Sequence, residues 1–396
     1  MMIRTSLFRT SLIRTCTFAL AMMVCSSLSF AGSAADSAHE KKADAVIAKA
    51  TAFLKSKQEA DGSWTPKSGP AVTAMIVSAM LDQPGASKDD PAIAKALAYV
   101  LSKVQKDGSI HDGILENYNT AICVSMLSKL GRTEQVKAAI EGGRDYLKKN
   151  QWRGAVGPDG KPTDTSHSFY GGFGYGHHGR PDGSNSQFAV QALIDSGSDC
   201  KDPEILAAVE FFSRMQGSKY NKYFGDKIVN DGGAIYATSI NKDKVGVPQS
   251  YGQEVIEDGT TKLGTYGSMT YAMFKTYIYA QLEIENPNDP RIKDALRWIS
   301  NNYTLAHNPG MPDAKKFEGY YYYFVTFSKA LDADPKRKMV TTADGKEHNW
   351  ANDLITKLAS LQKEDGSFTN EADRWLEGDP NVVTAYVLTA INAARY

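Results

Sequence analysis

A short turn sequence recurs along the chain, and this repeat limits the possible folds more than any other feature. Residues 58–64 read Gln-Glu-Ala-Asp-Gly-Ser-Trp, residues 105–110 read Gln-Lys-Asp-Gly-Ser-Ile, and residues 362–368 read Gln-Lys-Glu-Asp-Gly-Ser-Phe. Each copy follows a stretch that is apolar on one side and precedes a stretch that is mostly apolar. Self-similarity of this kind indicates stacked units, none of which can bury its apolar face alone.

The apolar residues on either side of the turn are spaced as in α-helices. Those that precede the first turn and share one helical face are Val46, Ile47, Ala50, Phe53 and Leu54. After the turn, residues 71–81 are apolar nearly all round. This order indicates an outer helix paired with a buried inner helix. The Asp-Gly-Ser turn supplies a glycine for positive φ and side-chain acceptors for free backbone N–H groups.

The same alternation predicts five further helical pairs. Their outer helices are expected at about residues 91–104, 133–152, 203–216, 290–302 and 349–362, and their inner helices at about 118–130, 186–195, 269–282, 317–331 and 381–394. An inner helix that is apolar on all sides must be surrounded by others, so a closed ring fits better than an open solenoid. We therefore predict an all-α fold, a single (α/α)6 toroid domain over residues 42–396, whose six helical hairpins form an inner and an outer ring.

The first 31 residues have the pattern of a secretory signal peptide. Three arginines precede a short apolar run at residues 18–24, and small residues follow up to Ala31. The apolar run is too short to span a bilayer, so we expect no transmembrane anchor. These features predict an exported protein, periplasmic or extracellular, with a flexible segment over residues 32–41 before the toroid.

Charge and cysteine content exclude several classes of protein. The 45 Lys and Arg residues balance the 45 Asp and Glu residues, whereas a nucleic-acid-binding protein usually has a basic surplus. Cys16 and Cys25 lie in the predicted signal peptide, which leaves Cys123 and Cys200. Two cysteines make no disulfide framework, and nothing in their spacing requires that they pair.

The turn sequence Gln-x-x-Asp-Gly-Ser-Trp resembles the QW repeat of squalene–hopene cyclases, whose toroid is shared by the β subunits of protein prenyltransferases. Further likenesses are Gly-Gly-Phe-Gly-Tyr at 171–175, Asp-Gly-Gly-Ala-Ile-Tyr at 231–236 and Thr-Ala-Tyr at 384–386. The resemblance implies a central cavity that takes an isoprenoid or polyprenyl ligand. It is more specific for the fold than for an activity, because one fold hosts many functions.

The chain departs from both families at their reactive residues. Class II terpene cyclases protonate an alkene with the middle aspartate of Asp-x-Asp-Asp, but residues 182–185 read Asp-Gly-Ser-Asn and place Ser184 at that position. Protein prenyltransferases bind zinc through an Asp and a Cys two residues later, whereas Asp199 and Cys200 are adjacent. We therefore expect no squalene-type protonation, no metal and no cofactor.

The candidate site residues lie where the inner helices begin, because helix N-termini present free N–H donors to a cavity in this fold. The candidate acids are Asp182, Glu318, Glu377 and Asp379, each of which could instead cap a helix. The candidate ligand-binding residues are Asn185, His177, His178, Tyr175, Tyr266, Tyr320 and Tyr323. Aromatic side chains at a cavity can stabilise a carbocation through their π faces or stack on sugar rings.

Three functions remain open at this stage. The first is an exported cyclase-like protein that handles a small hydrophobic isoprenoid, with or without catalysis. The second is a carbohydrate-active enzyme, which needs two carboxyl groups about 5–9.5 Å apart, and Glu318 with Glu377 or Asp379 is the candidate pair. The third is a non-catalytic toroid whose ring face binds another, unidentified protein.

A long insertion between Trp152 and Ser186 is rich in glycine and carries several aromatic and histidine side chains. Long loops in compact domains are usually functional or disordered. We predict that this insertion folds over the ring opening as a lid, with Asp182 and Asn185 facing the cavity.

Overall fold

The computed structural model describes residues 34–395 apart from residues 132 and 258, within a compact unit that spans Gly32–Tyr396. The predicted signal peptide, residues 1–31, lies outside the described residues. The first helix, α1, begins at Ser37, where the Asp36 side chain accepts hydrogen bonds from the Ala38 and His39 N–H groups. Residues 37–41 therefore belong to the first outer helix, which corrects the expectation of a flexible segment up to residue 41.

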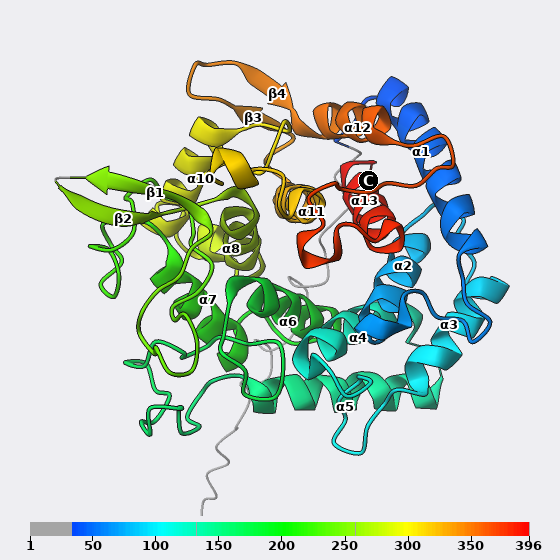
Figure 1. The fold of residues 1–396 in the computed structure, drawn as a ribbon, viewed down its shortest axis with the longest axis horizontal. Helices are drawn as coiled ribbons and strands as arrows, with labels where there is room; N and C mark the ends of the chain where they lie inside the picture. The colour runs from blue at the N-terminus through cyan, green and yellow to red at the C-terminus, as the bar shows by residue number, and fades with distance from the viewer. Residues whose placement is uncertain (1–33, 132, 258, 396) are drawn as a thin grey trace, which may run out of the picture. The chain divides into compact units, whose positions relative to one another are not determined.

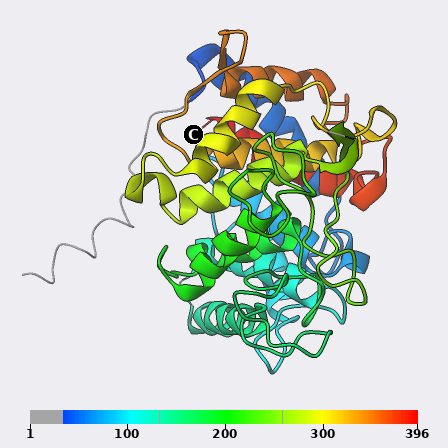
Figure 2. The same cartoon turned by 90° about the vertical axis from the view of Figure 1, so that its left-hand side faces the viewer.

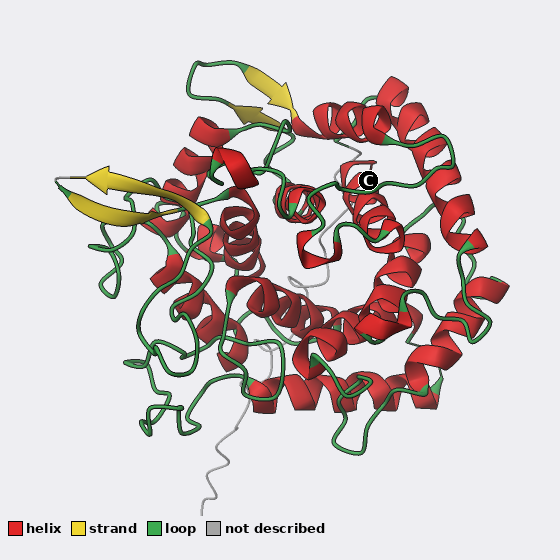
Figure 3. Ribbon diagram, in the orientation of Figure 1, coloured by secondary structure: helices red, strands yellow, loops and turns green. Residues whose placement is uncertain are grey.

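Twelve long helices of the described chain form two concentric rings (Figures 1 and 3). The outer ring holds α1 (Ser37–Ser56), α3 (Pro91–Leu101), α5 (Glu134–Asn150), α7 (Pro203–Met215), α10 (Pro290–Asn302) and α12 (Trp350–Leu361). The inner ring holds α2 (Ala71–Leu81), α4 (Glu116–Leu130), α6 (Gly183–Asp195), α8 (Gly267–Tyr279), α11 (Tyr320–Asp332) and α13 (Pro380–Arg395). Each inner helix contacts the next, α13 returns to α2, and α12 contacts α1. The predicted (α/α)6 toroid is confirmed.

Short elements that the sequence analysis did not predict interrupt the connections between long helices. They are the α-helical turn α9 (Leu282–Glu285), the 3-10 turns η1 (Pro66–Ser68), η2 (Asp313–Lys315) and η3 (Arg374–Leu376), and two antiparallel hairpins, β1 (Gly252–Glu257) with β2 (Thr260–Gly264) and β3 (Met339–Thr341) with β4 (Glu347–Asn349). Both hairpins lie at the edge of the ring in Figure 1. Seen from the side, the long connections gather at one side of the helices (Figure 2).

In two of its three copies, the repeated turn is hydrogen-bonded to the outer helix of the next hairpin. The Gln58 side-chain amide donates hydrogen bonds to the Gly62 carbonyl of its own turn and to the Ala92 carbonyl at the start of α3. The Gln362 amide makes the same pair of bonds with Gly366 and with Val46 of α1. In these two copies the glutamine is bonded to the following outer helix, and at the last turn it joins the end of the ring to its beginning. The Gln105 amide differs, because it donates to the Lys103 and His111 carbonyls on either side of its own turn.

The glycine of the turn allows this close approach. Gly62 has φ +91°, and a Cβ added there would lie 2.5 Å from the Lys95 carbonyl oxygen of α3. At Gly108, with φ +88°, an added Cβ would lie 2.4 Å from the Gly142 carbonyl oxygen of α5. Any other residue would combine an unfavourable backbone conformation with a backbone clash. The spacing of the repeat therefore follows from packing between neighbouring outer helices.

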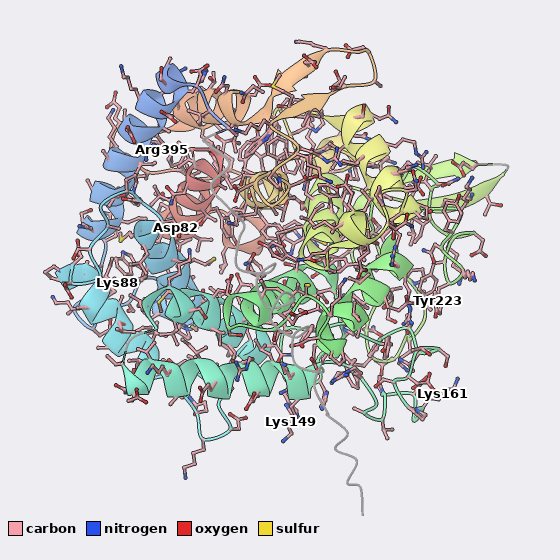
Figure 4. All side chains as sticks on the ribbon, turned by 180° about the vertical axis from the view of Figure 1, so that it is seen from behind. Asp82, Lys88, Lys149, Lys161, Tyr223 and Arg395 are labelled. Carbon is pink, nitrogen blue, oxygen red and sulfur yellow. The ribbon has the colours of Figure 1, made fainter. Side chains whose placement is uncertain are left out.

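One face of the toroid, seen from behind in Figure 4, carries the C-terminal ends of the inner helices. It lies opposite the face where the inner helices begin. At these C-terminal ends Asp82, the residue after α2, forms an ion pair of 2.5 Å with Lys129 at the end of α4, and Lys88 donates a hydrogen bond to the Lys129 carbonyl. Lysines near helix C-termini are favoured by the helix dipole.

Among the described residues, no helix has both the length and the apolar character needed to cross a membrane.

Candidate functional site

A cavity of about 200 Å³ lies where the inner helices begin. Six tyrosines border it: Tyr118, Tyr175, Tyr236, Tyr266, Tyr322 and Tyr386. Phe188, Met269, Leu115, Trp375 and Leu376 add apolar surface, and Ser184, Ser268 and Glu377 add polar groups. Ser184 and Ser268 are uncharged, so Glu377 is the one of these three polar side chains that can carry a charge at neutral pH.

The aromatic rings of the wall form a continuous belt. Tyr175 lies 6.0 Å from Tyr118 between ring centroids, Tyr118 lies 5.5 Å from Phe188, and Phe188 lies 6.1 Å from Tyr322. Tyr322 in turn lies 6.1 Å from Tyr386. These spacings fall in the range of favourable aromatic pairs. The belt therefore combines residues from α4, α6, α11 and α13 with one residue of the long insertion.

The tyrosines of the wall remain neutral at physiological pH. Burial raises the pKa of Tyr118 to about 12. The pKa values of Tyr236, Tyr266 and Tyr386 are raised well above the usual value, again mainly by burial. Their hydroxyl groups are hydrogen-bond donors and acceptors rather than bases.

Glu377 is a fully buried acid in the cavity wall. Its carboxyl oxygens accept a hydrogen bond of 2.7 Å from the Tyr322 N–H and another of 2.7 Å from the Asn370 side-chain amide. Burial raises the pKa of Glu377 to about 7, while the hydrogen bonds from Asn370 and from the first turn of α11 oppose the increase. The carboxyl group therefore exchanges its proton near neutral pH.

Asp182 caps α6 and lies behind the cavity wall. Its carboxyl accepts hydrogen bonds from the Asn185 N–H, at 2.9 Å, and from the Asn185 side-chain amide, at 2.9 and 3.0 Å. Burial raises the pKa of Asp182 to about 6, and the charge of Arg180 opposes this shift. Both Asp182 and Asn185 are buried, and neither borders the cavity. This corrects the expectation that these two side chains face it, since they bind each other instead.

The long insertion contributes Tyr175 to the cavity from its loop, and Ser184 from its end, which forms the first turn of α6. The Tyr175 carbonyl accepts hydrogen bonds from the Asn117 and Tyr118 N–H groups of α4, and its ring borders the cavity. Elsewhere the insertion packs against the outer wall, where the Trp152 indole donates a hydrogen bond to the Gly179 carbonyl. The insertion thus forms part of one cavity wall, and the predicted lid is reduced to Tyr175.

The two histidines of the insertion lie outside the cavity. The His178 ring packs 4.8 Å from Trp152, and the His177 and His178 rings are 4.5 Å apart. The His177 backbone N–H donates to the Glu116 carboxyl. Burial lowers the pKa of His178, so this imidazole favours its neutral form. Neither histidine borders the cavity, so the structure places both predicted ligand-binding residues away from it.

The predicted pair of catalytic carboxyl groups is not assembled at the cavity. Glu318 forms an ion pair of 2.6 Å with Arg374. Asp379 accepts hydrogen bonds from the Thr65 hydroxyl and from the Asn381 N–H, each at 2.8 Å. Neither side chain borders the cavity, so Glu377 has no second acid opposite it in the wall.

The start of α11 decides which aromatic side chains reach the cavity. The helix was expected to begin at residue 317 but begins at Tyr320, after Gly319 with φ +64°. The Tyr320 and Tyr323 hydroxyls donate to the Leu305 and Thr304 carbonyls, at 2.5 and 2.7 Å, and neither ring borders the cavity. The structure therefore places Tyr320 and Tyr323 outside this cavity, and Tyr322 is the tyrosine of the run that borders it.

No protein-family model matches the chain, and no curated protein does so either. Solved structures with a similar fold include the type II terpene cyclase MstE from Scytonema, with 13% identity, a TM-score of 0.50, and coverage of 89% of this chain and 98% of that one. The GH76A α-1,6-mannanase from Salegentibacter sp. has 10% identity, a TM-score of 0.53, and coverage of 89% and 99%. The unsaturated glucuronyl hydrolase from Bacillus sp. GL1 has 12% identity, a TM-score of 0.53, and coverage of 89% and 96%.

The chain shares its toroid with terpene cyclases and with carbohydrate-active enzymes alike. At such low identity these likenesses show the fold, and they do not distinguish squalene–hopene cyclases from the other toroids. The features that distinguish this chain from other toroids must therefore lie in the cavity itself.

Several residues of the cavity wall were not predicted from the sequence. They are Tyr118, Phe188, Tyr236, Tyr322, Trp375 and Tyr386. Tyr236 and Tyr386 are the last residues of two motifs that carried the family resemblance, at 231–236 and 384–386. Their place in these motifs could have marked them as candidate residues of the cavity. Trp375 had no such signal, because its place depends on a backbone turn with φ 57° that no glycine or proline marks.

Proposed function

We propose that the protein binds a compact isoprenoid, or the end of a polyprenyl chain, in the aromatic cavity. The observation that carries this proposal is the belt of aromatic rings with a single carboxyl group among them. Cavities for drug-sized ligands usually measure about 300–1,000 Å³. A volume of about 200 Å³ suits a short branched hydrocarbon or one end of a longer one.

Glu377 favours binding over alkene protonation. Its raised pKa, about 7, makes it a weaker acid than an ordinary glutamate, whereas protonation of an isolated alkene needs a strong acid. A neutral carboxyl group in an apolar wall is well suited to donate a hydrogen bond to an alcohol or carbonyl oxygen. We therefore propose that the ligand carries one oxygen near its bound end and that Glu377 holds it. Together with the signal-like first 31 residues, this proposal describes an exported isoprenoid-binding protein.

The carbohydrate alternative has less support from the site. Glycoside hydrolysis generally uses two carboxyl groups across the bound sugar. The cavity wall has one, because Glu318 and Asp379 are engaged elsewhere. The aromatic rings alone could stack on a sugar, so saccharides are included in the test.

Isothermal titration calorimetry with geraniol, farnesol and α-1,6-mannotriose tests the proposal. We expect micromolar binding of at least one isoprenoid alcohol and no binding of the saccharide. Phe188→Trp, which adds volume inside the cavity, is expected to weaken isoprenoid binding at least tenfold. Tyr320→Phe, at the start of α11 but outside the cavity, is the matched control and is expected to leave binding unchanged. Saccharide binding without isoprenoid binding would contradict the proposal.

A further inference from the structure

We infer that the same cavity also binds compact organic cations, in particular trimethylammonium groups, because its aromatic wall contains one acidic side chain and no basic one. This ligand class goes beyond the isoprenoid alcohol but rests on the proposed role of the cavity as a binding site. Cages of aromatic rings attract quaternary ammonium groups through the negative faces of the rings, and the attraction grows when the cation is desolvated.

The geometry of the wall meets the requirements of such a cage. Tyr118, Phe188, Tyr322 and Tyr386 come from four different inner helices, and their neighbouring rings lie 5.5–6.1 Å apart. Tyr236, which is buried, and Trp375, which is 37% exposed, also border the cavity. A rounded apolar cation can therefore contact several rings at once.

Aromatic rings at this end of the toroid already contact cations of the protein. The Arg180 guanidinium lies 5.1 Å from the centroid of the Tyr236 ring. The Arg374 guanidinium lies 4.4 Å from the Trp375 ring and 4.7 Å from the Tyr251 ring, which itself packs 4.9 Å from Tyr236. Neither arginine borders the cavity, so they leave its interior open to a cation of the ligand.

The charges around the cavity leave Glu377 without a balancing cation among the described residues. Arg374 is paired with Glu318, and the charge of Arg180 acts on the buried Asp182. Glu377 accepts hydrogen bonds from Asn370 and Tyr322 and forms no ion pair with a described residue. Once ionised, Glu377 gives the cavity one negative charge, which a cationic ligand would balance. The tyrosines do not compete for this role because their raised pKa values keep them neutral.

The decisive comparison uses choline and its neutral isostere 3,3-dimethylbutan-1-ol, which has nearly the same shape without the charge. In calorimetric titrations at pH 8, we expect choline to bind at least tenfold more tightly than the isostere. At pH 5.5, where Glu377 is protonated, the preference is expected to fall several-fold. Glu377→Gln is expected to remove this pH dependence and to keep a smaller preference for the cation, supplied by the rings.

Two variants in α11 distinguish the loss of an aromatic ring from a general loss of folding. Tyr322→Leu removes a ring of the cage, and we expect it to weaken choline binding at least fivefold. Tyr320→Phe is expected to have no effect. Equal affinity for choline and the isostere would overturn the inference, and so would a preference that disappears entirely in Glu377→Gln. If geraniol still binds in that case, the proposed isoprenoid function stands alone. If neither geraniol nor choline binds, both proposals are wrong.

Discussion

Carboxyl groups occupy two regions of this toroid, and their environments are opposite. In the repeated turns, Asp61 and Asp107 each accept a hydrogen bond from the backbone N–H and another from the hydroxyl of the serine two residues later. These bonds lower the pKa of both aspartates. Near the cavity, burial raises the pKa of Asp182 to about 6 and that of Glu377 to about 7.

The difference separates stabilising residues from residues that reduce stability. An aspartate that is hydrogen-bonded and partly hydrated favours the folded state when it is ionised. A buried carboxyl group with a raised pKa disfavours the folded state when it is ionised, and such groups cluster at functional sites. The turns therefore hold the ring together, whereas Glu377 is better explained by what the cavity binds.

The largest effect is expected from the residue that follows the first turn. Trp64 is fully buried, and its indole donates a hydrogen bond of 2.7 Å to the Leu54 carbonyl. Trp64→Ala should lower the free energy of unfolding by about 3–5 kcal/mol, the usual range for a buried tryptophan. Urea denaturation followed by circular dichroism measures this change.

Trp375→Ala is the matched control for that experiment. Trp375 borders the cavity and is 37% exposed, so its removal should lower the free energy of unfolding by well under half as much. Equal losses for the two tryptophans would show that the cavity wall supports the fold as strongly as the turns do, and the contrast between the regions would fail.

A smaller effect concerns the pH dependence of stability. Between pH 4.5 and about 7 the folded protein keeps the Glu377 proton while the unfolded chain releases it, so the free energy of unfolding falls as the pH rises. The shift corresponds to about 3 kcal/mol over this range. Glu377→Gln should remove this decline, as measured by urea denaturation at pH 5 and pH 7.5.

Asp107→Asn is the comparison for this experiment, because the pKa of Asp107 is shifted in the opposite direction from that of Glu377. Because the pKa of Asp107 is lowered, its contribution to stability is present above pH 3.8 and disappears only as the pH falls below that value. This variant should leave the difference between pH 5 and pH 7.5 unchanged. A steep decline that persists in Glu377→Gln would place its origin in another group.

The smallest expected effect comes from a turn aspartate. Asp107→Ala removes the two hydrogen bonds from Ser109 and should lower the free energy of unfolding by about 1 kcal/mol. Lys137→Ala breaks an exposed ion pair with Glu134 and should change it by less than about 0.5 kcal/mol. Chemical denaturation of both variants in one buffer resolves the two values. If both changes were equally small, the turn aspartates would be ordinary surface residues.

The repeat made the architecture predictable, because its periodicity reports packing that recurs in every hairpin. The helices Ala71–Leu81 and Pro290–Asn302 begin and end at the predicted residues. The two β hairpins were missed because they belong to single connections and take no part in the repeat.

The cavity wall was harder to predict because it depends on helix phase and on distant segments. Each residue turns a helix by about 100°, so within the first turn of α11 Tyr322 reaches the cavity while Tyr320 and Tyr323 point elsewhere, and a run of consecutive aromatic residues does not reveal which of them faces inward. The orientation of Asp182 depends on Asn185 and on burial, which sequence spacing does not report. Tyr175, Tyr236 and Trp375 come together only when the ring closes.

Ring closure also makes segments that are distant along the chain depend on each other. The Asp36 and Asn352 side chains are hydrogen-bonded, Gln362 reaches the Val46 carbonyl, and Asn392 reaches the Ala79 carbonyl. Until α13 is in place, α2 lacks one of its two inner neighbours, so the first hairpin reaches its full packing only when the last inner helix has formed. In a closed ring the chain could therefore begin and end at another connection. A suitable place is near Gly85, where an added side chain would meet no other atom. A circular permutant opened there would still have every hairpin between its two neighbours.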